Sequence, residues 1–81
     1  MFLVEMALVG ADHVQTTHGS EVFEDHTEAI VSAMAEMETL PTGVTQIKLI
    51  ATELSHDKFW TRTYVFSKCV DNTWVFKYFY N

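Results

Sequence analysis

The residue types best suited to chemistry in this chain are histidines and acids that cluster in its first third. Imidazole nitrogens and carboxylate oxygens are frequent ligands of zinc and other divalent ions. The candidate set comprises His13, His18, His26, Asp12, Glu21 and Asp25. Its spacing matches no compact ligand motif, so histidines that simply face solvent are the better interpretation. We therefore predict neither a bound metal nor another cofactor.

The chain contains no recognisable catalytic constellation. It lacks a nucleophile elbow, a Walker loop, a dinucleotide-binding fingerprint and a His-x-His zinc pair. Cys69 is the only cysteine, and nothing beside it in the sequence would activate a thiol. We interpret it as a small apolar sheet residue. A single cysteine excludes an intramolecular disulfide and agrees with a reduced, cytoplasmic setting. We expect that the protein is not an enzyme.

Charge is divided unevenly along the chain. The first 43 residues contain eight acids and neither lysine nor arginine, whereas all five cations follow. Such a surface can imitate the phosphates of a nucleic acid and dock on a basic surface that binds one. A solvated helix face is the alternative, although such faces usually carry lysines that relieve the repulsion. The predicted partner-binding residues are Glu21, Glu24, Asp25, Glu28, Glu36 and Glu38.

A second candidate surface lies in the last third of the chain, where aromatic rings alternate with cations. Its residues are Trp60, Arg62, Tyr64, Phe66, Lys68 and Lys77. Rings and cations together can stack bases and bind phosphates. The net charge of −6 opposes nucleic-acid binding, so a protein partner or a second copy is favoured. The alternative function is therefore a sheet-face binding module that forms a homodimer or contacts single-stranded RNA.

One helix is predicted to carry most of the acids. Asp25 can cap the amide of Glu28, and Glu28 can reach back to complete a capping box. The helix should run from Asp25 or His26 to about Leu40, where Pro-Thr-Gly at 41–43 ends it. An apolar stripe at helical spacing should form the face of the helix that packs in the core. A charge in place of Met34, one residue of this stripe, should therefore unfold the domain. The stripe consists of Ile30, Ala33, Met34 and Met37.

The remaining segments predict β-strands. Residues 1–9, 44–54, 59–70 and 74–80 alternate or are rich in β-branched and aromatic residues, and 21–23 forms a short additional strand. Residues 10–19 are rich in Gly, Asp, Thr and His, which favours a loop or a long hairpin connection. Residues 55–58 are predicted to form a turn.

The last two strands are predicted to form a hairpin with a two-residue turn at Asp71-Asn72. This turn pairs Lys68 with Val75, Phe66 with Lys77, and Tyr64 with Phe79. The uncharged face should then pack under the helix and leave the face of Arg62 and the other cations open, ready for self-association. That uncharged face consists of Phe59, Val65, Cys69, Trp74, Phe76, Tyr78 and Tyr80. A three-residue turn would shift the pairing by one and gather most aromatic residues on one side.

These elements predict an α+β fold with one α-helix packed on a four- to five-stranded antiparallel β-sheet. All 81 residues should form one small acidic domain with no membrane segment. The general type resembles the small, acidic, lysine-poor proteins that phages use against host nucleic-acid machinery, including DNA mimics and anti-CRISPR proteins. The stretch from Glu21 to Ile50, a short strand, capped helix, Pro-Thr-Gly and strand, also resembles phage inhibitors of bacterial RNA polymerase. The resemblance implies a cytoplasmic inhibitor or adaptor that docks on a basic, nucleic-acid-handling protein.

Overall fold

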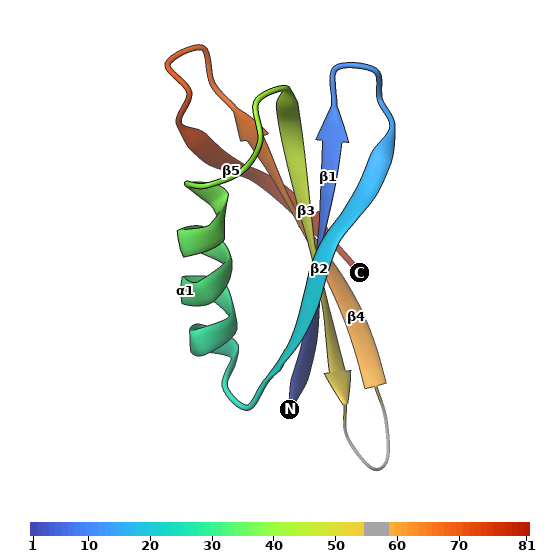
Figure 1. Ribbon diagram of the computed structural model, residues 1–81. Coiled ribbons are helices and arrows are strands. Elements are labelled where there is room, and N and C mark those ends of the chain that lie inside the picture. The colour runs from blue at the N-terminus through green and yellow to red at the C-terminus, as the bar shows by residue number, and fades with distance from the viewer. Residues whose placement is uncertain (55–58) are drawn as a thin grey trace.

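The computed structural model describes residues 1–54 and 59–81 and confirms the predicted α+β fold. Five strands form one antiparallel sheet in the order β2-β1-β3-β4-β5, and one helix packs on it (Figure 1). The elements are β1 (Phe2–Gly10), β2 (Gln15–Phe23), α1 (His26–Met37), β3 (Val44–Leu54), β4 (Phe59–Lys68) and β5 (Trp74–Tyr80). Among the described residues, no helix has the length and apolar character needed to cross a membrane.

The helix begins where the sequence indicates, with a different capping contact. The Asp25 carboxylate accepts a hydrogen bond from the backbone N–H of Thr27 at 3.2 Å, and not from that of Glu28. The reciprocal capping box is therefore replaced by a simple N-cap. Glu28 still lies in the first turn, where its negative charge interacts favourably with the helix dipole and stabilises the helix.

The helix packs on the sheet through small residues, and this corrects the predicted apolar stripe. Ala29, Ala33 and Met37 are buried, whereas the Met34 side chain is 56% exposed. Alanines bring the helix backbone close to the sheet, and the helix therefore turns its alanine ridge inward and leaves Met34 at its flank. The predicted place of Met34 in the core was wrong, and the reason for expecting a charge at that position to unfold the domain no longer holds.

The core lies between α1 and the β1–β3 part of the sheet. Its fully buried side chains include Ile47 and Leu49 of β3, which pair in register with Leu8 and Met6 of β1. Every second residue of these two strands therefore points at the helix. Burying such side chains is the main favourable term for a chain of this size.

Strand β2 is longer than the sequence indicates. Residues 15–19, predicted as part of a loop, pair with β1, and a bulge at His18 interrupts the ladder between Met6 and Ala7. All β2 residues except Phe23 are exposed, because β2 is an edge strand and a cavity lies between it and α1 on the helix side. The actual turn before it holds His13 with a positive φ of 64°.

The β4–β5 hairpin has a three-residue connection in place of the predicted two-residue turn. Asn72 adopts a left-handed conformation with φ 69°, and the backbone N–H of Cys69 donates to the carbonyl of Thr73 at 2.8 Å. Asparagine tolerates this conformation well, whereas the two-residue turn would require it at Asp71 also. Lys68 therefore pairs with Trp74.

A bulge then restores part of the predicted register. Phe66 pairs with Phe76, Lys77 forms the bulge, and Tyr64 pairs with Phe79. Of the three predicted pairs named above, only Tyr64 with Phe79 is confirmed. The shift moves Trp74 and Phe76 to the side of the sheet that carries the helix, since they pair with residues on that face.

The face of the hairpin on the helix side is consequently the one that carries Arg62 and Lys68, and not the predicted uncharged face. Phe66 pairs with Ile47 and Tyr64 with Leu49, so both rings share the face of the core and pack against it. Val65 and Tyr78 pair with each other on the opposite face. The predicted orientation was wrong because it was assigned from the absence of charge, whereas the β3–β4 pairing places Tyr64 and Phe66 beside the core residues of β3. The predicted turn at 55–58 and the side chain of Phe59 lie outside the described residues.

Candidate functional site

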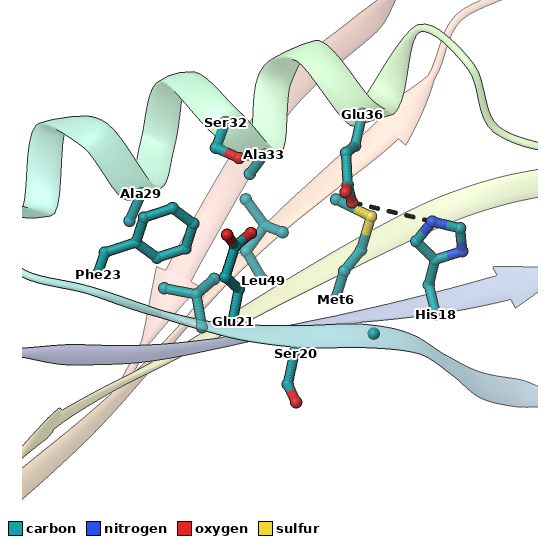
Figure 2. Close-up of a pocket in the computed structure, with 12 residues that line it drawn as sticks. Met6, His18, Ser20, Glu21, Phe23, Ala29, Ser32, Ala33, Glu36 and Leu49 are labelled. Carbon is teal, nitrogen blue, oxygen red and sulfur yellow. Dashed lines mark ion pairs between the residues drawn. The ribbon is translucent and has the colours of Figure 1, made fainter.

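The predicted acidic residues fall on two sides of the helix. Glu21 lies on β2 and Glu36 on α1, and both line a cavity of about 140 Å³ between these elements (Figure 2). Glu28 faces the same side of α1, beside Phe23 at the end of β2. Glu24 and Asp25 are exposed in the short connection between the two elements. We call these five acids, Glu21, Glu24, Asp25, Glu28 and Glu36, the acidic flank.

Glu38 does not belong to the acidic flank. It caps the C-terminus of α1 and lines a cleft on the opposite side of the helix, together with Lys68 of β4. The structure therefore brings together five of the six acids that the sequence indicated and separates the sixth. Helical rotation explains the separation, since residues two apart on a helix lie on different sides.

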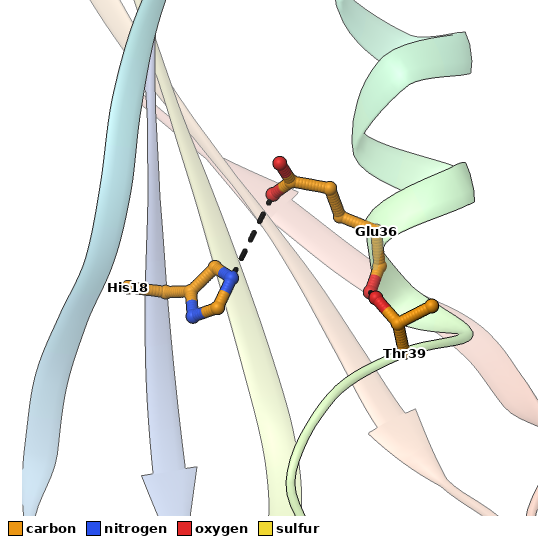
Figure 3. Close-up of polar contacts among 3 residues, drawn as sticks. All are labelled: His18, Glu36 and Thr39. Carbon is orange, nitrogen blue, oxygen red and sulfur yellow. Dashed lines mark hydrogen bonds and ion pairs between the residues drawn. The ribbon is translucent and has the colours of Figure 1, made fainter.

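A single contact ties the acidic flank to the β2 edge. Nε2 of His18 lies 3.8 Å from a carboxylate oxygen of Glu36, a distance that makes an ion pair when His18 is protonated (Figure 3). The bulge at His18 turns this side chain toward α1. The hydroxyl of Thr39 donates to the Glu36 carbonyl oxygen at 3.1 Å and closes the end of the helix.

The acidic flank has no lysine or arginine partner in the part of the chain that the structure describes. The ion pairs found there join the N-terminal amine to Glu53 and His18 to Glu36. Most of the flank's negative charge is therefore compensated only by solvent and counterions. This arrangement raises the local negative potential and favours contact with a basic surface.

The three histidines do not gather into a metal site. His13 lies in the β1–β2 turn, His18 faces Glu36, and His26 begins the helix. Nε2 of His26 lies 3.3 Å from the Tyr64 hydroxyl, and its ring packs against Phe2. Within residues 1–54 and 59–81, no group of three or more His, Cys, Asp or Glu side chains is arranged to hold an ion.

The second candidate surface lies on the helix side of β4 and β5. Strand β4 places Trp60, Arg62, Tyr64, Phe66 and Lys68 on one face, as predicted from their alternation. Lys77 forms the bulge of β5 and is out of register with them. The helix covers β1 and β2, so the hairpin beside it remains largely uncovered.

Two of the three cations of this surface, Arg62 and Lys68, lie over aromatic rings. The Arg62 guanidinium carbon is 5.3 Å from the Trp60 ring centroid and 4.8 Å from that of Phe79. Its Nε donates to the Asn81 side-chain oxygen at 2.9 Å. Lys68 places its ammonium 5.4 Å from the Trp74 ring. These cation–π contacts hold the cations close to the sheet.

The sequence did not place Trp74 and Phe76 on this surface. Trp60, Phe76 and Phe79 are each between 41% and 52% exposed. A cleft of about 540 Å³ lies between the helix and the neighbouring part of the hairpin, lined by Met34 on the helix and by Phe66 and Trp74 on the hairpin. The sequence signal for this arrangement was Asn72, because asparagine tolerates the left-handed backbone conformation that the three-residue connection requires. We call the exposed rings of Trp60, Phe76 and Phe79 the aromatic patch.

The hairpin turn contains a perturbed carboxyl group. The Asp71 carboxylate accepts hydrogen bonds from the Thr73 hydroxyl at 2.6 Å and from the Thr73 backbone N–H at 3.1 Å. These two bonds hold the pKa of Asp71 below its ordinary value of 3.8. The group stabilises the turn and has no partner suited to catalysis.

Comparison with known proteins gives no relationship on which a function can be based. No family model matches this chain, and no curated protein or solved structure shows significant similarity to it.

Proposed function

We propose that this protein is a non-enzymatic binding domain that docks its acidic flank on a basic, nucleic-acid-binding surface of a partner protein. It would act as an inhibitor or adaptor in the cytoplasm, in the manner of phage DNA mimics and anti-CRISPR proteins. The observation that supports this proposal is the exposed carboxylates of the flank, which have no lysine or arginine partner within the described residues.

The length of the acidic flank suits a nucleic-acid mimic. The helix has 12 residues and, at 1.5 Å per residue, is about 18 Å long. Duplex DNA rises 3.4 Å for each phosphate of one strand, so about five phosphates occupy that length. Glu28 and Glu36 lie on this helix, and the other three acids of the flank lie on β2 and in the connection just before the helix. The five acids beside this length are therefore similar in number to the phosphates of a single strand over the same distance. Long-range attraction would speed the encounter with a basic groove.

Capture from a bacterial lysate at low and high salt tests this proposal. The test variant carries Glu21→Gln and Glu24→Gln, which remove two charges from the flank and leave the capping residue Asp25 in place. The control carries Thr17→Lys and Ser20→Lys, which change the net charge equally on the other face of β2, where Ser20 points away from the helix (Figure 2).

We expect the test variant to retain several-fold less of the captured protein, and we expect high salt to release that protein from the wild type. The control should capture nearly as much as the wild type. Capture that persists in high salt and is equal for both variants would contradict docking through the acidic flank.

A second candidate function is a sheet-face binding module that uses the aromatic patch. Exposed aromatic area of this kind usually marks an interaction surface. Arg62 lies over the ring faces of Trp60 and Phe79, so a nucleic-acid base would have to displace it before stacking there. The patch therefore suits a protein partner better than single-stranded RNA.

A further inference from the structure

The outer side of the helix carries apolar side chains that no part of the described chain covers. Val31 is 62% exposed and Met34 is 56% exposed, and they are three residues apart on adjacent turns of α1. Glu28 and Glu38 lie before and after them along the chain and have no cationic partner among the described residues. The result is an apolar ridge, Val31 and Met34, with an acid at each end.

The aromatic patch has the complementary character. Its rings are apolar; Arg62 lies over two of them, and Lys68 lies over the adjoining ring of Trp74. The aromatic patch is on the helix side of the sheet, and a cleft lies between α1 and the hairpin, lined by Met34 on the helix and by Phe66 and Trp74 on the hairpin. A surface that is apolar with acidic ends therefore lies beside one that is apolar with basic groups.

Two adjacent complementary surfaces on one chain fit a twofold dimer. If the axis passes through the cleft, the ridge of each copy lies on the patch of the other, and both contacts form at once. A fully covered aromatic side chain buries about 150–250 Å², so three half-exposed rings offer on the order of 300 Å² for each copy. The two patches together supply about half of the lower limit of the 1,200–2,000 Å² that stable interfaces bury, and the two ridges and the charged groups beside them add to it.

The two other apolar surfaces are less suited to a second copy. Strand β5 is an edge, but its bulge at Lys77 interrupts the ladder and places a cation there, and both features oppose strand pairing. The face opposite the helix exposes Tyr78 and Tyr80 without a neighbouring ridge that would complement them. Charge complementarity is therefore confined to the helix side.

From these features we infer that the protein forms a homodimer in which the apolar ridge of each helix packs on the aromatic patch of the other copy. Of the acidic flank, Glu28 borders this contact, whereas Glu21 and Glu36 line the cavity on the β2 side of α1 and stay exposed in this dimer. The inference does not depend on docking to a basic partner, and the dimer would present that flank twice.

The oligomeric state can be measured by sedimentation equilibrium of the purified full chain at concentrations from low to high micromolar. We expect the wild type to approach twice the 9.3 kDa of one chain. Met34→Glu should be monomeric at all concentrations, and so should Phe76→Lys. Tyr78→Lys is the matched control, because Tyr78 is as exposed as Phe76 and lies on the opposite face of β5. It should remain dimeric.

Mixing the two monomeric variants tests the ridge-on-patch geometry itself. A heterodimer of Met34→Glu with Phe76→Lys has one unaltered contact and one contact in which the new charges are opposite. We expect the mixture to regain the dimer mass, which an unfolded variant would not do. A wild-type mass of 9.3 kDa at every concentration, a mixture that stays monomeric, or a dimer lost only in Tyr78→Lys would overturn the inference.

Discussion

The two edge strands of the sheet differ in what they expose. Strand β2 presents threonine, serine, glycine and glutamate, and the helix lies along it; strand β5 presents mostly aromatic rings beside an uncovered cleft. Both edges carry a bulge, at His18 in β2 and at Lys77 in β5. Bulges and charged residues protect sheet edges against pairing with other strands. The two edges therefore differ in their side chains: those of β2 are mostly polar or acidic, and those of β5 are mostly aromatic.

The helix determines this difference because it covers only the β2–β1–β3 part of the sheet. Alanines on α1 allow close packing over β1 and β3, and the buried residues of the chain concentrate there. On the other side of the cleft, Tyr64, Phe66 and Trp74 only partly bury their rings against the same core. We expect stability to be concentrated in the covered part, and contact between copies of the chain to involve the uncovered part.

The largest expected effect is a core truncation in the covered part. Ile47→Ala removes a side chain that is fully buried between the helix and the sheet. It should lower the free energy of unfolding by about 2–5 kcal/mol, because the lost burial is compounded by a cavity. Urea unfolding monitored by circular dichroism measures this change.

Met34→Asp is the matched comparison for that truncation. A charge at this half-exposed ridge position should cost no more than about 0.5 kcal/mol in dilute, monomeric protein. A loss as large as that of Ile47→Ala would show that Met34 belongs to the core and would break the contrast between the two parts.

The bounds of a strand can be predicted from the sequence more accurately when the strand is buried than when it is exposed. Strands β3 and β5 have the predicted bounds, because their apolar and β-branched residues make a clear pattern. Residues 15–19 of β2 show no such pattern, since an edge strand exposed on both faces has no need to alternate. The sequence therefore predicts covered strands better than exposed ones.

The surfaces were harder to predict than the elements, because a shift of one residue exchanges the faces of a strand. Asn72 and the bulge at Lys77 together place Trp74 and Phe76 beside the helix. The helix stripe was misplaced for a related reason: hydrophobicity favours Met34, whereas close packing favours Ala29. By contrast, the acids of the flank were found from charge alone, as their sequence neighbourhood also brings them together in space.

An intermediate effect is expected at the turn that sets the hairpin register. Asn72→Ala places a residue with a Cβ in the left-handed conformation and should cost roughly 1 kcal/mol in unfolding free energy. Asn72→Gly should be close to neutral, because glycine adopts this conformation freely while adding freedom to the unfolded chain. Urea unfolding of both variants measures the difference, and equal losses would mean that the backbone conformation at Asn72 does not control the hairpin.

The smallest effect is expected from the Asp71 carboxyl group in the same turn. Its pKa is lowered in the folded protein by the Thr73 hydroxyl and then by the Thr73 backbone N–H. A carboxyl group with a lowered pKa stabilises the fold above its unfolded pKa, and that contribution is lost as the pH falls through the folded value. The carboxyl group is fully exposed, so solvent keeps its contribution small. The affected range therefore lies below about pH 4.

Thr73→Val isolates this contribution, because valine keeps the β-branched shape and the backbone N–H but removes the hydroxyl donor. In an NMR titration of the side-chain carboxyl signal, the pKa of Asp71 should move back toward 3.8 in this variant and stay lower in the wild type. The remaining amide bond should keep it from returning fully. An identical titration in both proteins would show that the hydroxyl contact does not form in solution. The Asp71–Thr73 contact would then not help to fix the turn that places the aromatic patch on the helix side.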